Sequence, residues 1–382
     1  MTAFLLLEPE SPGAAWAPWT GVRPLAELRA GAWRIRERWE RALGVAASGI
    51  LGAHVEAFVD VDAPRVLAAA PDGAFLAASW FAPAARDITL GPGVRRLTHE
   101  GDTVACIIAP GVAPCLDDEG PSQEIAGVRV SGAHDLLRAL ELLLGPDCAE
   151  ATGGVPLPAG TIVLGSADRV VSQGAVVEPG VVFDVRNGGV VLEAGAEVRS
   201  GTRLEGPCWV GAGARIVGGF VRGSVIGPRC VVRGEVSSSI FLGYANKAHD
   251  GFVGHSIIGH WANLGAGTTT SNLKNTYGPV RLEADGLRIE TGRTLLGSLI
   301  GDHAKTAIGT MLPTGTIVGA GANVFGAASI PKHVPAFAWG CAGERLSEEG
   351  FLRIAGRVLP RREVDLTPER AASLSATYRR LA

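Results

Sequence analysis

Residues 191–217 read VLEAGAEVRSGTRLEGPCWVGAGARIV, and apolar side chains recur in this stretch at every sixth position. A small residue stands two places before each large one, as with Ala196 before Val198 and Ala214 before Ile216. Strand residues two apart point to the same side. Each hexad therefore offers one large and one small side chain to a narrow interior, and this pattern is typical of a parallel β-helix.

The same period covers most of the second half of the chain. The large members of the series are Leu192, Val198, Leu204, Val210, Ile216, Ile226, Val232, Phe252, Ile258, Leu264, Ile300, Leu312, Val318, Val324 and Ile330, with Thr306 as a weak member. Cys208 and Cys230 occupy small-residue positions, so we interpret them as packing residues. The period fails between about Thr270 and Leu296, which predicts an excursion from the helix at about 270–296.

The first 150 residues have a different, mixed pattern. Apolar runs at Phe4–Leu7 and 104–108 predict strands, whereas helical spacing follows Pro24 as far as Leu43. A second helix is predicted over about 134–144, ended by Gly145-Pro146. Thr367-Pro368 predicts the start of a terminal helix that runs to about Leu381. The expected units are an α/β domain over 1–152, a β-helix over 153–340 and a helical tail over 341–382.

Composition excludes several classes of protein. A net charge of −3 gives no basic surface for nucleic acid. No apolar run reaches the ~20 residues of a membrane span, and the opening residues lack the charge pattern of a signal peptide, so we expect a cytoplasmic protein. The six cysteines form no C-x-x-C pair, which argues against a zinc ribbon or a disulfide scaffold.

Polar residues gather just before and inside the predicted excursion, at 246–255, 263–268 and 271–274. By the hexad phase, His249 and Asn263 point outward from the aliphatic interior. A histidine whose pKa lies near the working pH is the usual general base. From spacing alone, a solvated surface histidine remains the alternative interpretation of His249.

The run Lys247-Ala248-His249, the run from Asn263 to Thr268, and Asn272 resemble one family of enzymes. It is the bifunctional glucosamine-1-phosphate acetyltransferase/N-acetylglucosamine-1-phosphate uridyltransferase family. The opening at 23–39 resembles a branch of it with an abbreviated, divergent nucleotidyltransferase-like N-terminal domain. The resemblance implies a left-handed β-helix, acetyl-coenzyme A (acetyl-CoA) as co-substrate, an amino-sugar phosphate as acceptor and assembly as a homotrimer.

The resemblance also implies roles for single residues. His249 matches the general base, Asn263 a residue that contacts the amino sugar, and Asn272 a residue near acetyl-CoA. Lys247 and Lys274 are assigned to substrate binding from their charge and proximity. Phe252 stands where the commoner form of the family has tyrosine.

The N-terminal domain lacks the glycine-rich loop of ordinary sugar nucleotidyltransferases. The first strand is followed instead by Glu8-Pro9-Glu10-Ser11-Pro12-Gly13. Arg23 and Arg29 could bind nucleotide phosphate, and Asp60 and Asp62 are possible metal ligands. Surface charge is the alternative interpretation of all four. The resemblance implies nucleotidyl transfer from a nucleoside triphosphate, with Mg²⁺, if this domain is active.

Two other functions stay open at this point. His249, His255 and His260 are similar to the zinc histidines of the β-helical carbonic anhydrases, although His249 and His255 could share one ion only with a partner chain. A non-catalytic scaffold that binds sugar nucleotides without turnover is the third possibility.

Overall fold

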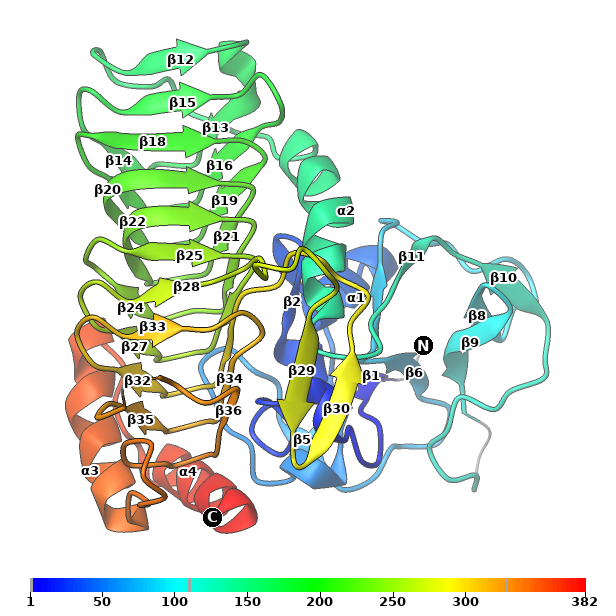
Figure 1. The fold of residues 1–382 in the computed structure, drawn as a ribbon. Helices are drawn as coiled ribbons and strands as arrows, with labels where there is room; N and C mark the ends of the chain where they lie inside the picture. Colours follow the sequence, from blue (N-terminus) through cyan, green and yellow to red (C-terminus); the bar gives the residue numbers. More distant parts are fainter. Residues whose placement is uncertain (1–2, 109–110, 328) are drawn as a thin grey trace.

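The computed structural model describes residues 3–108, 111–327 and 329–382. It consists of an N-terminal α/β domain packed against the side of a tall β-helix, with two helices at the C-terminal end (Figure 1). Within the described parts of the chain, no helix is long and apolar enough to cross a membrane.

The N-terminal domain is built on a seven-stranded sheet with the strand order β10-β8-β9-β6-β1-β4-β5. Strands β6, β1, β4 and β5 run parallel to one another, and β9 is antiparallel to both β6 and β8. The strands are β1 (Phe4–Leu7), β4 (Gly49–Leu51), β5 (Val66–Leu67), β6 (Phe75–Ala78), β8 (Arg96–His99), β9 (Asp102–Ile107) and β10 (Ser122–Glu124). A small antiparallel pair, β7 (Phe81–Pro83) and β11 (Gly127–Arg129), lies outside this sheet.

The helix predicted after Pro24 forms only in its second half, as α1 (Ile35–Leu43). The first half is a single 3₁₀ turn at Leu25–Glu27, followed by a hairpin of β2 (Arg29–Ala30) and β3 (Trp33–Arg34). Gly31 turns this hairpin with φ of 68°, and a Cβ there would collide with the Arg38 guanidinium. The turn needs a backbone conformation that favours glycine, so it interrupts the helical spacing.

The second predicted helix, α2 (Asp135–Ala149), continues through Gly145-Pro146 instead of ending there. Tertiary contacts hold its last turn. The Asp147 carboxylate accepts a 2.8 Å hydrogen bond from the Ala32 backbone N–H and pairs with Arg38. Cys148 is buried in the domain core. These contacts outweigh the local cost of proline inside a helix.

The parallel β-helix predicted from the repeat, left-handed as the resemblance implies, is confirmed. One long sheet holds β12 (Ile162–Leu164), β14 (Val176–Val177), β15 (Val182–Asp184), β17 (Glu197–Val198), β18 (Thr202–Glu205), β20 (Arg215–Arg222), β22 (Val231–Ser237), β24 (Asn246–Lys247), β25 (Phe252–Gly254), β27 (Asn263–Leu264), β32 (Lys305–Thr306) and β35 (Asn323–Val324). A second holds β13 (Val170–Ser172), β16 (Val190–Leu192), β19 (Cys208–Val210), β21 (Val225–Ile226), β23 (Ile240–Phe241), β26 (Ile257–Ile258), β31 (Leu299–Ile300), β34 (Ile317–Val318) and β36 (His333–Val334). A short pair, β28 (Thr269–Thr270) and β33 (Met311–Leu312), extends the stack.

Parallel register stacks the hexad residues into interior columns. One column runs Leu192, Val210, Ile226, Phe241, Ile258, Ile300, Val318, Val334. Cys208 and Cys230 are fully buried in this core, as predicted, and burial raises the pKa of each thiol to about 12. The predicted phase is wrong at Phe252, which is only half-buried, because its neighbour Val253 fills the interior.

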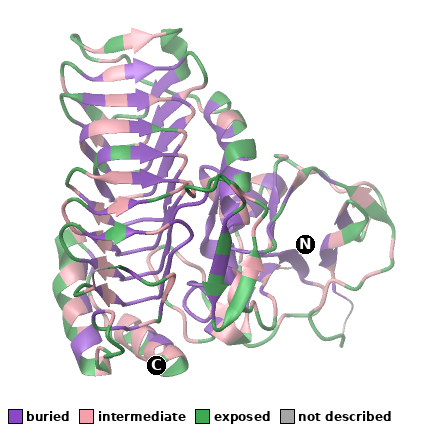
Figure 2. Cartoon of the chain, in the orientation of Figure 1, coloured by how far each residue is buried: buried purple, intermediate pink, exposed green. Residues whose placement is uncertain are grey.

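One sheet of the β-helix is apolar on its outer side as well. The outward residues of the nine-stranded sheet belong to the same buried cluster as the N-terminal core, and purple buried residues continue from one unit into the other in Figure 2. They are Val171, Val191, Trp209, Val225, Ile240, Ile257, Leu299 and Ile317. This outer column is the surface on which the N-terminal domain is docked.

The residues of the predicted excursion include a hairpin of β29 (Arg281–Ala284) and β30 (Leu287–Glu290). It lies beside the N-terminal domain (Figure 1), and Val280 and Leu282 join that domain's buried core. Arg293 lies where the chain returns to the β-helix, and it forms a salt bridge with Glu141 of α2.

The tail contains α3 (Glu348–Val358), which the sequence pattern did not reveal, and the predicted terminal helix α4 (Pro368–Leu381). The Thr367 hydroxyl caps α4 by accepting a 3.4 Å hydrogen bond from the Arg370 backbone N–H. Ala355 of α3 packs in one cluster with Tyr244 and Trp261 at the corners of the β-helix.

A buried polar cluster joins the N-terminal segment to the β-helix. The Asp302 carboxylate accepts hydrogen bonds from Arg23 Nε at 2.8 Å, Trp19 Nε1 at 3.1 Å and the His260 backbone N–H at 3.0 Å. Arg23 also pairs with Asp60. Because Asp302 and its three donors are buried, the loss of this carboxylate leaves buried donors without their acceptor and Arg23 with one carboxylate partner fewer.

We expect Asp302→Ala to lower the free energy of unfolding by about 3–5 kcal/mol, because the Arg23 guanidinium loses one of its carboxylate partners. The exposed pair Arg199–Glu197 provides a control, since Glu197→Ala should change the free energy by about 1 kcal/mol or less. Guanidinium chloride unfolding of the full chain, followed by tryptophan fluorescence, measures both. Equal effects of the two substitutions would contradict the proposed importance of the buried cluster.

Candidate active site

His249 lies on an exposed corner of the β-helix, two residues after β24. It points outward as expected, although that expectation was counted from Phe252, where the hexad phase is wrong. It borders an open depression of about 450 Å³. The residues that line this depression are Arg233, Ala248, His249, Asp250, Gly251, Ala266 and Gly267. A reactant could therefore reach the imidazole from solvent.

Lys247 was predicted to bind substrate, but its side chain points into the β-helix. It is fully buried and pairs in register with Val232, in an interior column. Its ammonium donates hydrogen bonds to the main-chain oxygens of His249 and Arg233, the latter at 3.4 Å. Lys247 is thus a structural support for the corner, and its predicted contact with substrate is not available in this arrangement.

The cation beside His249 is Arg233, which the sequence analysis did not identify. Its Nε lies 3.0 Å from Asp250 Oδ1 in a salt bridge, and both side chains are largely exposed. The signal was present in the sequence, because Arg233 directly follows the interior residue Val232 and so must point outward.

Asn263 is half-buried and faces outward from β27, the strand that pairs with β24. Its Oδ1 accepts a 2.9 Å hydrogen bond from Asn246 Nδ2, and Arg362 Nη2 donates to Asn246 Oδ1 at 3.2 Å. The C-terminal tail therefore fixes the orientation of this amide pair. Asn263 is not among the residues that line the His249 depression.

Asn272 lies where the chain leaves the β-helix for the excursion. Its Nδ2 is 2.8 Å from His255 Nδ1, and its backbone oxygen accepts a 2.9 Å hydrogen bond from the Leu296 N–H. Burial, together with the charge of Arg293, lowers the pKa of His255 and favours the neutral ring that can accept from an amide.

Lys274 belongs to the excursion, where its ammonium donates a 2.7 Å hydrogen bond to the Pro279 oxygen. Asn272 and Lys274 do not line the His249 depression either. Within one chain, the structure thus brings His249 together with Arg233. Of the other predicted residues, Asn263 lies in β27, and Asn272 and Lys274 lie where the chain enters the excursion.

Arg23 and Arg29 are buried, so the structure contradicts both the predicted phosphate contacts and the alternative of surface charge. Arg23 pairs with Asp60 and Asp302. Arg29 donates to the Leu242 oxygen at 3.1 Å and the Ala32 oxygen at 2.5 Å. Both guanidinium groups hold the N-terminal domain to the β-helix instead of facing a ligand.

The two possible metal ligands of the N-terminal domain do not form a Mg²⁺ site. Burial alone would raise the pKa of Asp60, but the charges of Arg23 and His260 outweigh it and hold the pKa well below its usual value. Asp62 is exposed, as the alternative of surface charge predicted. Among the described residues, no three His, Cys, Asp or Glu side chains converge as metal ligands.

The zinc interpretation is wrong for His260. The ring is buried, with Nδ1 3.2 Å from Asp60 Oδ2, at the junction between the domains. It cannot reach a metal shared with His249 or with a second chain.

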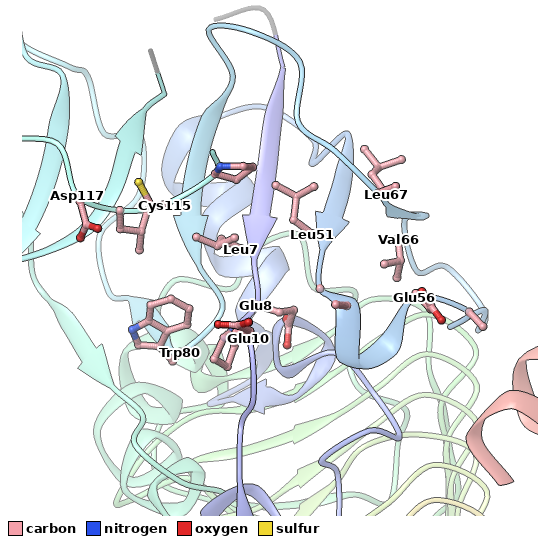
Figure 3. Close-up of a pocket in the computed structure, with 17 residues that line it drawn as sticks. Leu7, Glu8, Glu10, Leu51, Glu56, Val66, Leu67, Trp80, Cys115 and Asp117 are labelled. Carbon is pink, nitrogen blue, oxygen red and sulfur yellow. The ribbon is translucent and has the colours of Figure 1, made fainter. Parts of the chain in front are cut away.

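The N-terminal domain carries a large pocket of about 1030 Å³, shown in Figure 3. It lies where β1, β4 and β5 end, which is the usual ligand position in open α/β sheets. None of its lining residues was predicted from the sequence to contact a ligand.

Burial lowers the pKa of Lys247 to about 8 from 10.5. Between these values the unfolded chain keeps the proton that the folded chain has lost, so folding becomes more favourable as the pH rises. We expect the stability of the wild type to increase relative to Lys247→Met between pH 8 and pH 10.5. Guanidinium chloride unfolding at both pH values measures this difference. A pH-independent difference would contradict the buried position of this ammonium.

Comparisons with known proteins agree with the family resemblance. Residues 5–143 match the family described as sugar nucleotidyl transferase. A bifunctional sugar-1-phosphate nucleotidylyltransferase/acetyltransferase of Sulfurisphaera tokodaii is 34% identical over 100 residues, which is 26% of this chain and 25% of that protein. The bifunctional protein GlmU of a Jannaschia species is 33% identical over 187 residues, which is 48% of this chain and 36% of that protein.

The matched part of the chain thus spans roughly a quarter to two fifths of the length of these curated relatives. A solved UDP-N-acetylglucosamine acyltransferase is 13% identical, with a TM-score of 0.22, over 50% of this chain and 71% of that chain. We draw nothing from this last overlap. The resemblance predicted from the sequence is confirmed by the relatives: the chain is similar to bifunctional nucleotidyltransferase/acetyltransferase proteins, and its N-terminal domain matches the sugar nucleotidyl transferase family.

Proposed function

We propose that the β-helix transfers an acetyl group from acetyl-CoA to the amino group of an amino-sugar phosphate, with glucosamine 1-phosphate as the first candidate. The observation that carries this proposal is the open depression that holds His249 and Arg233 side by side. An imidazole can take a proton from an amine, and a guanidinium can bind a phosphate. The names of the relatives support the same reaction class.

In the proposed reaction, the neutral amine attacks the thioester carbonyl of acetyl-CoA. The new C–N bond forms, the C–S bond breaks, and coenzyme A leaves as the thiolate, which becomes the thiol when it receives the proton that the amine has lost. His249 accepts the proton that the amine loses. Asn263 and Asn272, which are held by Asn246 and His255, are proposed contacts to the sugar and to acetyl-CoA.

We also propose that the site is completed in a homotrimer. The excursion packs against its own N-terminal domain and supplies no residue to the His249 depression. A second wall must therefore come from bound substrate or from another copy of the chain. The nine-stranded face is occupied by the N-terminal domain, so the other faces are the ones open to such a contact.

Nucleotidyl transfer by the N-terminal domain, which would lead to UDP-N-acetylglucosamine, rests on the family match alone. The two arginines and one of the carboxylates predicted for this reaction already have partners inside the protein. They are Arg23, Arg29 and Asp60. A non-catalytic scaffold is the remaining alternative, and it would bind acetyl-CoA and sugar without releasing thiol.

We expect His249→Ala to reduce thiol release from acetyl-CoA, measured with glucosamine 1-phosphate, by about 10²–10⁴-fold, because the reaction loses its general base. His249 is exposed, so the thermal unfolding midpoint should not change. His333→Ala, at another strand of the β-helix, is the control and should keep full activity. No release by the wild type, or an unchanged rate in His249→Ala, would overturn the proposal.

Arg233→Ala should raise KM for glucosamine 1-phosphate by tenfold or more, since a hydrogen bond to a charged group contributes about 1.5–3 kcal/mol. KM for acetyl-CoA should stay the same, and so should the low activity on unphosphorylated glucosamine. Arg199→Ala, which removes an exposed arginine elsewhere on the β-helix, provides the matched control. An equal loss with both acceptors would show that Arg233 does not contact the phosphate.

A further inference from the structure

The large pocket of the N-terminal domain has the position and volume of a ligand site. Its volume of about 1030 Å³ is at the upper end of the range for small-molecule sites, which is about 300–1,000 Å³. It opens beyond the ends of β1, β4 and β5 (Figure 3).

Every charged side chain that lines this pocket is a carboxylate. Glu10, Glu56 and Asp117 line it with exposed carboxylates, and none of the three forms a salt bridge within the described residues. No lysine, arginine or histidine is among the described residues that line it. A polyphosphate would therefore meet several carboxylates and no cation.

Glu8 occupies two backbone N–H groups that could otherwise bind a phosphate. Its buried carboxylate accepts hydrogen bonds from the backbone N–H groups of Leu25 and Ala26, at 2.8 and 3.0 Å. His54 Nε2 lies 3.1 Å from the same carboxylate. Free main-chain N–H groups of this kind often bind phosphate. Here an internal anion already occupies them, at the edge of the pocket.

The remaining wall is apolar. Leu7, Leu51, Val66 and Leu67 surround the cavity, and the half-buried ring of Trp80 lies near Glu8 and Glu10 (Figure 3). An indole face attracts a cation and packs against the apolar face of a ring. Such a wall next to unpaired carboxylates suits a small cationic ring compound.

We propose that this pocket binds a phosphate-free, amine-bearing ring compound of the amino-sugar class, and that it does not bind a nucleoside triphosphate. The ammonium of the ligand would face Glu10, and its ring would pack on the neighbouring Trp80 (Figure 3). This site is separate from the His249 depression, so the inference does not depend on acetyl transfer.

Isothermal titration calorimetry of the full chain tests the inference with three probes: glucosamine, N-acetylglucosamine, and UTP with Mg²⁺. We expect glucosamine to bind. N-acetylglucosamine should bind at least tenfold more weakly because it lacks the cation. Any heat from UTP with Mg²⁺ should be the same for the wild type and for Trp80→Leu.

Glu10→Gln/Glu56→Gln should weaken glucosamine binding at least tenfold, and both positions are exposed, so the fold should be kept. Trp80→Leu tests the apolar wall. Glu349→Gln, on the exposed side of α3, is the matched control for charge. Arg233→Ala separates the two sites, because it changes the His249 depression and should leave this binding as it is.

Three results would overturn the inference. They are glucosamine binding that the double glutamine variant does not weaken, N-acetylglucosamine binding as tight as that of glucosamine, and UTP binding that is lost in Trp80→Leu. The first would place the amine elsewhere, the second would remove the role of the cation, and the third would make the pocket a nucleotide site.

Discussion

The outer apolar column of the nine-stranded sheet determines how the two halves of this protein are arranged. Trp209, Val225, Ile240, Ile257 and Leu299 point outward from the β-helix and are nevertheless buried. Removal of this apolar surface from water favours a fixed contact with the N-terminal domain. The hydrogen bonds of Arg29 to Leu242 and of Arg23 to Asp302 then give that contact a defined orientation.

This docking leaves the proposed acetyl-transfer site open. The excursion, the only long departure from the β-helix in the described part of the chain, is held by Val280, Leu282 and Arg293 against the N-terminal domain. His249 therefore stays on an uncovered corner, supported from inside by the ammonium of Lys247. A buried lysine in an apolar column is costly. Its hydrogen bonds to the corner carbonyls explain how this position tolerates a lysine.

The two candidate sites have opposite electrostatic character. The His249 depression combines an imidazole with the Arg233 guanidinium and suits a phosphorylated amine. The N-terminal pocket combines carboxylates with the Trp80 ring and suits an amine without phosphate. A match to the sugar nucleotidyl transferase family describes the domain that carries this pocket, whereas the ligand depends on the side chains that line it.

The sequence by itself determined the β-helix, the buried cysteines and the excursion, because a period of six and the alternation of strand side chains are local properties. It also contained the outer column, since pairs such as Trp209-Val210 and Ile257-Ile258 place two apolar residues together. Only the tertiary structure decided the orientation of Lys247, the burial of Arg23 and Arg29, and the helix limits around Gly31 and Pro146. The two arginines and the helix limits depend on partners far along the chain, such as Asp302, Leu242 and Asp147, whose proximity no local pattern records. Lys247 depends on the corner oxygens of His249 and Arg233, which the folded β-helix places beside its ammonium.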